Sequence, residues 1–166
     1  MSCKDRIRAR FYEEGLRTQR LASVFEDRDL ALRPGEGSMT SAELLAHLVA
    51  GRNFLRGLFT EKEPTVELFK ISVDTNSVAA LLRQLAESWR AVIAAIDRVD
   101  DEWLHGEISP LGPDRKISRA EMAGWMIDHE IHHRGQLSVY VRVAGKVPPP
   151  LYAPVTEDVL EVSPKG

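Results

Sequence analysis

Apolar residues recur at the three- and four-residue spacing of an amphipathic helix in four long segments of the chain. The predicted helices span about 5–26, 40 to shortly before Pro64, 77–99 and 118–145. The second begins with Thr40 and Glu43 and the fourth with Ser118 and Glu121, each pair spaced as in a capping box. Strand signals are scarce. The pattern therefore predicts an all-α fold, a four-helix bundle.

Two of the connections between these helices are long, at about 60–76 and 100–116. The first is long enough to carry a crossover, so a simple up-and-down order of the helices is not assured. Gly145 is placed to end the last helix as its C′ residue. The segment VPPPLYAPV, from about 147 onward, cannot be helical through its prolines, and we expect an extended strap over the bundle that frays near Pro164. Residues 1–166 are expected to form a single domain.

Composition and charge narrow the classes of function. The chain has 166 residues, of which 43% are hydrophobic, and a formal net charge of −3 with no basic stripe, which argues against a nucleic-acid partner. The opening MSCKDRIRAR is too charged for a secretory signal, and no apolar run approaches the ~18–20 residues of a membrane span. The single cysteine, Cys3, precludes an internal disulfide. We therefore expect a cytoplasmic protein without a membrane partner.

The candidate chemistry lies in the histidines. On a helical wheel His129 and His133 fall within the apolar stripe of the last helix, one turn apart, while His132 falls on its rim. His47 faces the core from the second helix, and Gly51, one turn later, leaves room beside it. A core histidine is usually a hydrogen-bonded packing residue, but two on one apolar face would each need polar partners.

Three inward histidines on two neighbouring helices suit a divalent metal ion. Imidazole nitrogens bind zinc, nickel, copper and iron, and we expect zinc, nickel or iron here. Three protein ligands leave one position open for water or substrate, as in a catalytic site. The predicted ligands are His47, His129 and His133.

Residues 129–133 also match H-E-x-x-H, the signature of zinc proteases. The extended form of that signature needs glycine at 136 and histidine at 139, where this chain has Gln136 and Val139. Glu157 could serve as a distant third ligand, but it lies in the proline-rich tail, and no predicted strand offers an edge to a peptide. We therefore expect no protease activity, and we interpret Glu130 as a solvated carboxylate on the side of the helix.

The segments TSAELLAHLVAGRNFL and DHEIHHRGQLSVYVRVAGKVPPPLY resemble the DinB/YfiT-like proteins over nearly the whole chain, most specifically in H-x-x-x-H-R-G-Q. This resemblance implies a four-helix bundle, often dimeric, that binds a divalent metal through three histidines, which correspond here to His47, His129 and His133. Some members are metal-dependent transferases that join a low-molecular-weight thiol to an electrophile, and others are thiol-dependent isomerases.

We therefore expect a metalloenzyme with a small-molecule substrate, in the first place a thiol S-transferase. The alternatives are a metal-dependent hydrolase and a metal-binding or stress-response protein without turnover. Trp125, Gln136 and Tyr140 are candidates to line the pocket, although such aromatic residues are more often plain core. An outward stripe of small and apolar residues on the last helix predicts a homodimer unless the third helix covers it: Gly124, Ile127, Ile131, Gly135 and Ser138.

Overall fold

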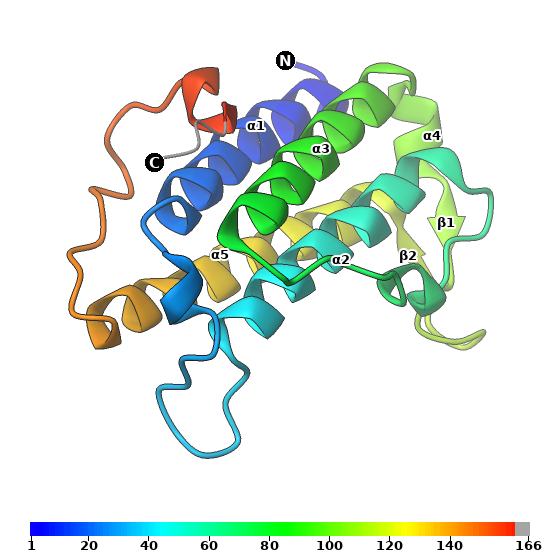
Figure 1. Cartoon of the computed structure of the whole chain (residues 1–166). Helices are drawn as coiled ribbons and strands as arrows, with labels where there is room; N and C mark the ends of the chain where they lie inside the picture. The colour runs from blue at the N-terminus through cyan, green and yellow to red at the C-terminus, as the bar shows by residue number, and fades with distance from the viewer. Residues whose placement is uncertain (162–166) are drawn as a thin grey trace.

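The computed structural model describes residues 1–161 and is built from four long helices (Figure 1). These are α1 (Cys3–Ala22), α2 (Ser41–Thr60), α3 (Val78–Asp97) and α5 (Arg119–Val143). The shorter elements are η1 (Asp27–Asp29), η2 (Val66–Phe69), α4 (Asp101–His105), β1 (Glu107–Ile108), β2 (Ile117–Ser118) and η3 (Glu157–Leu160). None of the described helices is both long and apolar enough to cross a membrane.

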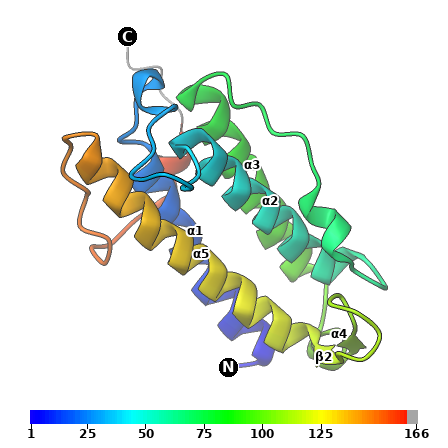
Figure 2. The same ribbon diagram turned by 90° about the horizontal axis from the view of Figure 1, so that it is seen from below.

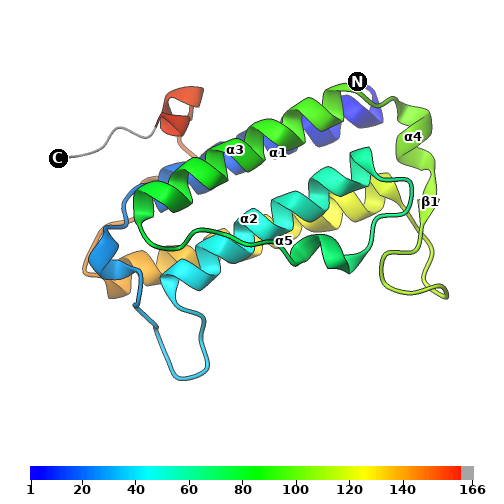
Figure 3. The same cartoon turned by 45° about the vertical axis from the view of Figure 1, so that its right-hand side comes forward.

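The four long helices form a bundle in which successive helices are not simply neighbours. α1 packs against α3 and α5, and α2 packs against the same two helices, so that α1 and α2 lie on a diagonal (Figure 2). α2 and α3 run in the same direction, because residues 61–77 return along the length of the bundle before α3 begins (Figure 3). The connection that was long enough for a crossover therefore carries one, and it lays η2 along α2.

The ends of the helices follow from local capping. Thr40 and Glu43 form the predicted capping box at the start of α2, with each side chain accepting a hydrogen bond from the other residue's backbone N–H. At α5 the Ser118 hydroxyl accepts from the Glu121 N–H. Gly145 follows α5 with φ 76°, the left-handed conformation expected of a C′ glycine.

Helix α1 differs most from its predicted span of 5–26. It begins at Cys3, because Ser2 and Asp5 form a capping box that the prediction overlooked. It ends at Ala22, so Val24 and Phe25 lie beyond the helix. The second long connection, for which no element was predicted, contains α4 and the two short antiparallel strands β1 and β2.

The C-terminal segment forms the expected strap, and side chains of α1 hold it. The Arg20 guanidinium donates to the backbone oxygens of Pro150, Ala153 and Pro154. The Tyr12 hydroxyl donates to Glu157 over 2.6 Å, and η3 lies against α1 and α3. The predicted fraying near Pro164 falls outside the described residues.

The apolar core is divided into two clusters by a polar layer at mid-bundle. One cluster lies toward the end that carries α4 and includes Phe11, Phe54, Trp89 and Met126. The other lies toward the opposite end and includes Leu21, Leu48, Leu81 and Leu137. The buried residues between the clusters are charged or polar: Glu14, Thr18, Gln19, Arg52, Glu130 and Arg134.

The outward stripe predicted on the last helix is only partly exposed. Ile127 is buried in the core and Ile131 packs against it. The prediction was wrong on this point because α1, rather than α3, packs along α5. The large apolar side chains that α5 does expose are Trp125, Val139 and Val143. They lie within about 40° of one another on a helical wheel.

Candidate metal centre

The imidazole rings of His47, His129 and His133 converge on one point between α2 and α5. Nε2 of His129 lies 2.9 Å from Nε2 of His47 and 3.1 Å from Nε2 of His133. One nitrogen from each of the three residues lies within 4.8 Å of the others, and among residues 1–161 no carboxylate oxygen joins the group. The structure thus brings together the three histidines that the sequence analysis selected.

Hydrogen bonding among the rings does not account for this geometry. Nε2 of His129 has either one proton or one lone pair, so it cannot bond to both neighbouring nitrogens. Oε1 of Gln136 lies 2.7 Å from Nδ1 of His133. Because an amide oxygen only accepts, that Nδ1 carries the proton and Nε2 of His133 presents a lone pair to the cluster.

The spacing of the nitrogens suits a metal ion. Two nitrogens bound to one tetrahedral zinc at ~2.0–2.1 Å are about 3.3 Å apart, close to the spacing found here. The cluster is therefore a fitting donor set for a divalent ion.

The surroundings keep these histidines neutral. Burial, followed by the neighbouring His133 and His47, lowers the pKa of His129 to about 4. Burial also lowers the pKa of His47 and of His133 below the ordinary value of 6.5. Neutral imidazole is the form that binds a metal, so at neutral pH few protons compete for the nitrogens.

Gly51 makes room for His129 rather than for His47. A Cβ atom on Gly51 would lie 3.1 Å from Cε1 and 3.3 Å from Nδ1 of the His129 ring. The prediction that the missing side chain leaves space in this region was correct, but the ring that uses the space comes from α5, because the α2 backbone approaches α5 closely here.

Phe69 covers one side of the cluster and was not recognised in the sequence. Its ring stacks on Phe54 at 5.0 Å between centroids, and it lies 6.1 Å from the rings of both His47 and His129. Phe69 belongs to η2, so only the crossover brings it to the site. An open cavity of about 620 Å³ lies beside Phe69 and His47, between the loop before α2 and the crossover. Its other lining residues include Arg33, Met39, Glu43, Ile71, Val73 and Thr75.

Glu130 points away from the histidines, and its interpretation as a solvated carboxylate was wrong. It is 3% exposed, and its two carboxylate oxygens accept from Nη2 and Nε of Arg52 over 2.5 and 3.1 Å. Burial by itself raises the pKa of Glu130, but the Arg52 guanidinium, together with the Thr18 hydroxyl and Arg134, outweighs this effect and brings the pKa below its usual value. The glutamate of the H-E-x-x-H match is therefore one partner of a buried ion pair with Arg52.

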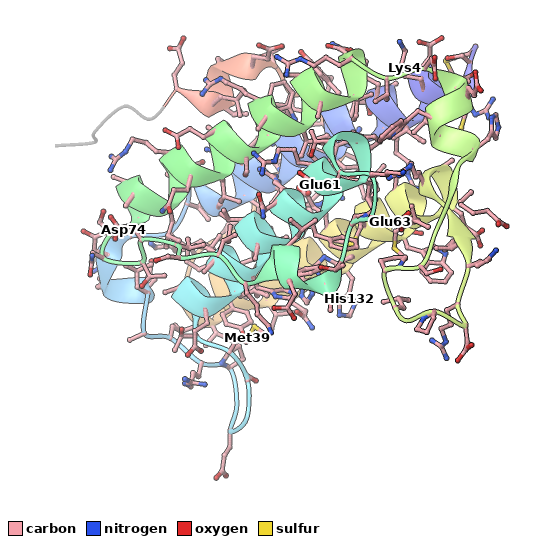
Figure 4. All side chains as sticks on the ribbon, turned by 90° about the vertical axis from the view of Figure 1, so that its right-hand side faces the viewer. Lys4, Met39, Glu61, Glu63, Asp74 and His132 are labelled. Carbon is pink, nitrogen blue, oxygen red and sulfur yellow. The ribbon has the colours of Figure 1, made fainter. Side chains whose placement is uncertain are left out.

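The remaining candidates have other places in the structure. Trp125 is 51% exposed, so it is neither core nor part of the cluster. Tyr140 is buried and donates through its hydroxyl to Met39 O, tying α5 to the loop before α2. Gln136 bridges His133 to His132. His132 is exposed on the same side of the bundle as Met39 (Figure 4). Glu157, the possible distant third ligand, accepts a hydrogen bond from the Tyr12 hydroxyl instead.

Comparison with known proteins identifies related sequences and structures. The profile of the DinB family matches residues 3–163. The uncharacterized protein YjoA of Bacillus subtilis is 27% identical over 138 residues, which are 81% of this chain and 86% of YjoA. The crystal structure of YjoA, a DinB-like protein, superposes with a TM-score of 0.72 and 25% identity, covering 88% of this chain and 96% of that one.

Two further solved structures share the fold at lower sequence identity. A DinB-like protein from Bacillus cereus has a TM-score of 0.70 at 22% identity, covering 84% of this chain and 91% of its own. YfiT from B. subtilis, described as a probable metal-dependent hydrolase with an unusual four-helix bundle topology, has a TM-score of 0.67 at 17% identity. That comparison covers 86% of this chain and 88% of YfiT.

Proposed function

Because this chain belongs to the DinB family, we propose that it is a divalent-metal-dependent enzyme that acts on a small molecule. Its metal ligands would be His47, His129 and His133. The observation that carries the proposal is the convergence of three neutral imidazole nitrogens at the edge of an open cavity. Three protein ligands leave one coordination position free, which is typical of catalytic rather than structural sites. Zinc, nickel and iron all suit such a site.

The reaction that we propose is the transfer of a low-molecular-weight thiol to an electrophile. When bound, a divalent ion lowers the pKa of a thiol or a water in its open position toward neutrality. The neutral three-histidine shell leaves the ion its full charge, which favours an anionic fourth ligand. A zinc protease uses the glutamate of H-E-x-x-H as its base, but Glu130 is held by Arg52 here. Glu43, a carboxylate that lines the cavity, is held by the Thr40 N–H and by Arg33. With both glutamates engaged, the site is better suited to a thiol, which ionises more readily than water.

The chain's own residues would orient the ligands and shield the site. Gln136 holds the proton of His133 on Nδ1, so that Nε2 faces the cluster. Phe69 excludes water from the side of His47 and His129 on which its ring lies. In the overall reaction with a haloaromatic, the sulfur forms a bond to carbon, the halide leaves, and the thiol proton passes to solvent. With an epoxide, the C–O bond breaks and the proton ends on the epoxide oxygen.

Hydrolysis is the second candidate, since the same ion could activate water. It is favoured by the similarity to YfiT, which is described as a probable metal-dependent hydrolase. The third candidate is a metal-binding protein without turnover. Its main measurable property would be the stabilisation of the fold against heat by the bound metal.

One assay separates these functions. The metal-loaded protein is incubated with a haloaromatic or an epoxide and a panel of cellular thiols. We expect product only when metal and thiol are both present, and none with His129→Ala, whereas His132→Ala should keep most of the activity. Hydrolysis of esters or amides without any thiol would replace the transferase by a hydrolase. If neither activity is found, the binding-protein alternative is favoured.

A further inference from the structure

The guanidinium of Arg52 is bonded to every other long helix of the bundle. Arg52 lies on α2 and is 1% exposed. It donates to Leu85 O of α3 over 2.7 Å, to Gly15 O of α1 over 3.2 Å, and to both carboxylate oxygens of Glu130 on α5. The guanidinium that donates these four hydrogen bonds is planar, and its five N–H groups point in fixed directions. Their directions therefore constrain where the four helices lie relative to one another.

The Arg52–Glu130 pair connects the same two helices that supply the histidines. Glu130 directly follows His129, and Arg134 directly follows His133. α5 thus carries two parallel rows, about 100° apart: a histidine row that meets His47 and a charged row facing the interior. Arg134 pairs with Glu14 of α1 over 2.5 Å, as Glu130 pairs with Arg52 of α2. His47 lies five residues before Arg52, so their Cα atoms are about one and a half turns, or about 7.5 Å, apart along α2.

A metal site on two separate helices needs their register to be accurate. A one-residue slip along a helix is about 1.5 Å, whereas ligands must be held to within about 0.5 Å. The apolar contacts on either side of the polar layer are non-directional. A buried bidentate ion pair is directional, and breaking it would leave a charge uncompensated in the interior.

We propose that Arg52 is a positioning residue for the metal centre. Its bonds to Glu130 set the register and rotation of α5 against α2 at which His129 and His133 meet His47. This role rests on the proposed function, because it presumes that the three histidines bind a metal. It predicts an effect on metal affinity beyond any effect on the stability of the fold.

Replacing both partners by apolar residues separates positioning from stability. A buried ion pair can often be replaced in this way without loss of stability, whereas removal of one partner is strongly destabilising. The double variant Arg52→Met/Glu130→Leu should therefore fold, and it lacks the directional bonds. The free energy of unfolding is measured on the metal-free protein. Metal affinity is measured by competition with a chromogenic chelator, and ligand geometry by the absorption spectrum of bound Co²⁺.

We expect the double variant to bind metal about tenfold more weakly than wild type, the lower end of the loss caused by removing a group bonded directly to a ligand, because this pair acts through the helices. Its Co²⁺ bands should also shift. Arg119→Gln is a matched control, because Arg119 is also a buried arginine that fixes α2 to another part of the chain. Its guanidinium donates to Leu58 O within α2 and to the backbone oxygens of Glu61 and Lys62, which directly follow α2. This control should lower stability while leaving the affinity and the Co²⁺ spectrum of the folded protein unchanged.

The possible failures are distinguishable. A folded double variant with wild-type affinity and an unchanged Co²⁺ spectrum would overturn the positioning role and leave the metal site intact. A wild-type protein that binds no metal would overturn the proposed function, and the positioning role with it. If the double variant does not fold, Glu130→Gln, which keeps the shape of the side chain, is judged by the same two readouts.

Discussion

Nε2 of His47 lies 2.9 Å from Nε2 of His129, although 82 positions separate the two residues in the chain. Nε2 of His133 lies 3.1 Å from the same His129 nitrogen. His129 is thus the central member of the cluster. The neighbouring His132 points elsewhere, toward the Gln136 amide, which makes it a natural control for the three proposed ligands.

The first prediction concerns metal content. The purified protein should hold about one divalent ion per chain, and His47→Ala, His129→Ala and His133→Ala should each lose it, because two imidazoles hold an ion much less tightly than three. His132→Ala should retain most of the metal. Elemental analysis of the four variants is the measurement. Undiminished metal in all three ligand variants would refute the site.

The second prediction is the absence of peptide cleavage. Glu130 is bound to Arg52 in the interior, so it cannot act as the base of an H-E-x-x-H protease. The metal-loaded protein should leave denatured casein intact. Cleavage that is present in the wild type and lost in Glu130→Gln, with both saturated with metal, would restore the protease interpretation.

The third prediction concerns a glycine at a helix crossing. A Cβ atom on Gly15 would lie 2.3 Å from Cδ1 of the buried Trp89 ring. Gly15→Ala should therefore destabilise the fold by about 1–3 kcal/mol through overpacking, even though alanine is the better helix former. Gly124 is the control, because a Cβ there meets nothing within 4 Å. Urea unfolding should show Gly124→Ala to be neutral or stabilising, and an equal response of the two variants would contradict the packing argument.

The fourth prediction is a loss of stability in acid that involves Asp29. Burial by itself raises the pKa of Asp29, but hydrogen bonds from Lys146 and from the Glu26 N–H outweigh burial and bring the pKa below its ordinary value of 3.8. A carboxylate with a lowered pKa in the folded state stabilises the fold above its unfolded-state pKa. That contribution is lost as the pH falls from about 3.8 through the folded-state pKa.

Urea unfolding of the metal-free protein between about pH 5 and pH 2 tests this. The wild type should be more stable than Asp29→Asn at the upper end of this range, and the difference should shrink as the pH falls. A difference that does not change with pH would show that Asp29 acts through its shape rather than its charge.

The fifth prediction is a homodimer formed through the C-terminal end of α5, where Val139 and Val143 are exposed one turn apart. Both side chains are about half exposed, and together they form a small apolar patch that a second copy of the chain could cover. Light scattering should give twice the mass of one chain for the wild type and for Val66→Lys, a control at an exposed valine of η2. Val139→Lys/Val143→Lys should be monomeric. A monomer mass for the wild type at working concentrations would refute the dimer.

The four long helices and the three histidines could be predicted from the sequence, because the signals involved are local. A helix end depends on side chains within one turn, as at Thr40 and Glu43. The direction in which His129 and His133 point depends only on helical periodicity and on the apolar residues nearby. These features require no knowledge of which helices are neighbours, so the four helices and the convergence of the three histidines were predicted, although the ends of α1 were not.

The burial of Glu130 and the role of Phe69 were decided by the tertiary structure alone. A charged side chain on a single helix is expected to face water. Glu130 lies in the interior only because Arg52, 78 positions away, supplies a compensating charge there. Phe69 reaches the histidines because the connection between α2 and α3 crosses back along the bundle, as the wide separation of Glu61 and Asp74 shows (Figure 4). Local periodicity gives each helix its inward face, but pairing between distant charges and the path of the crossover decide what that face meets.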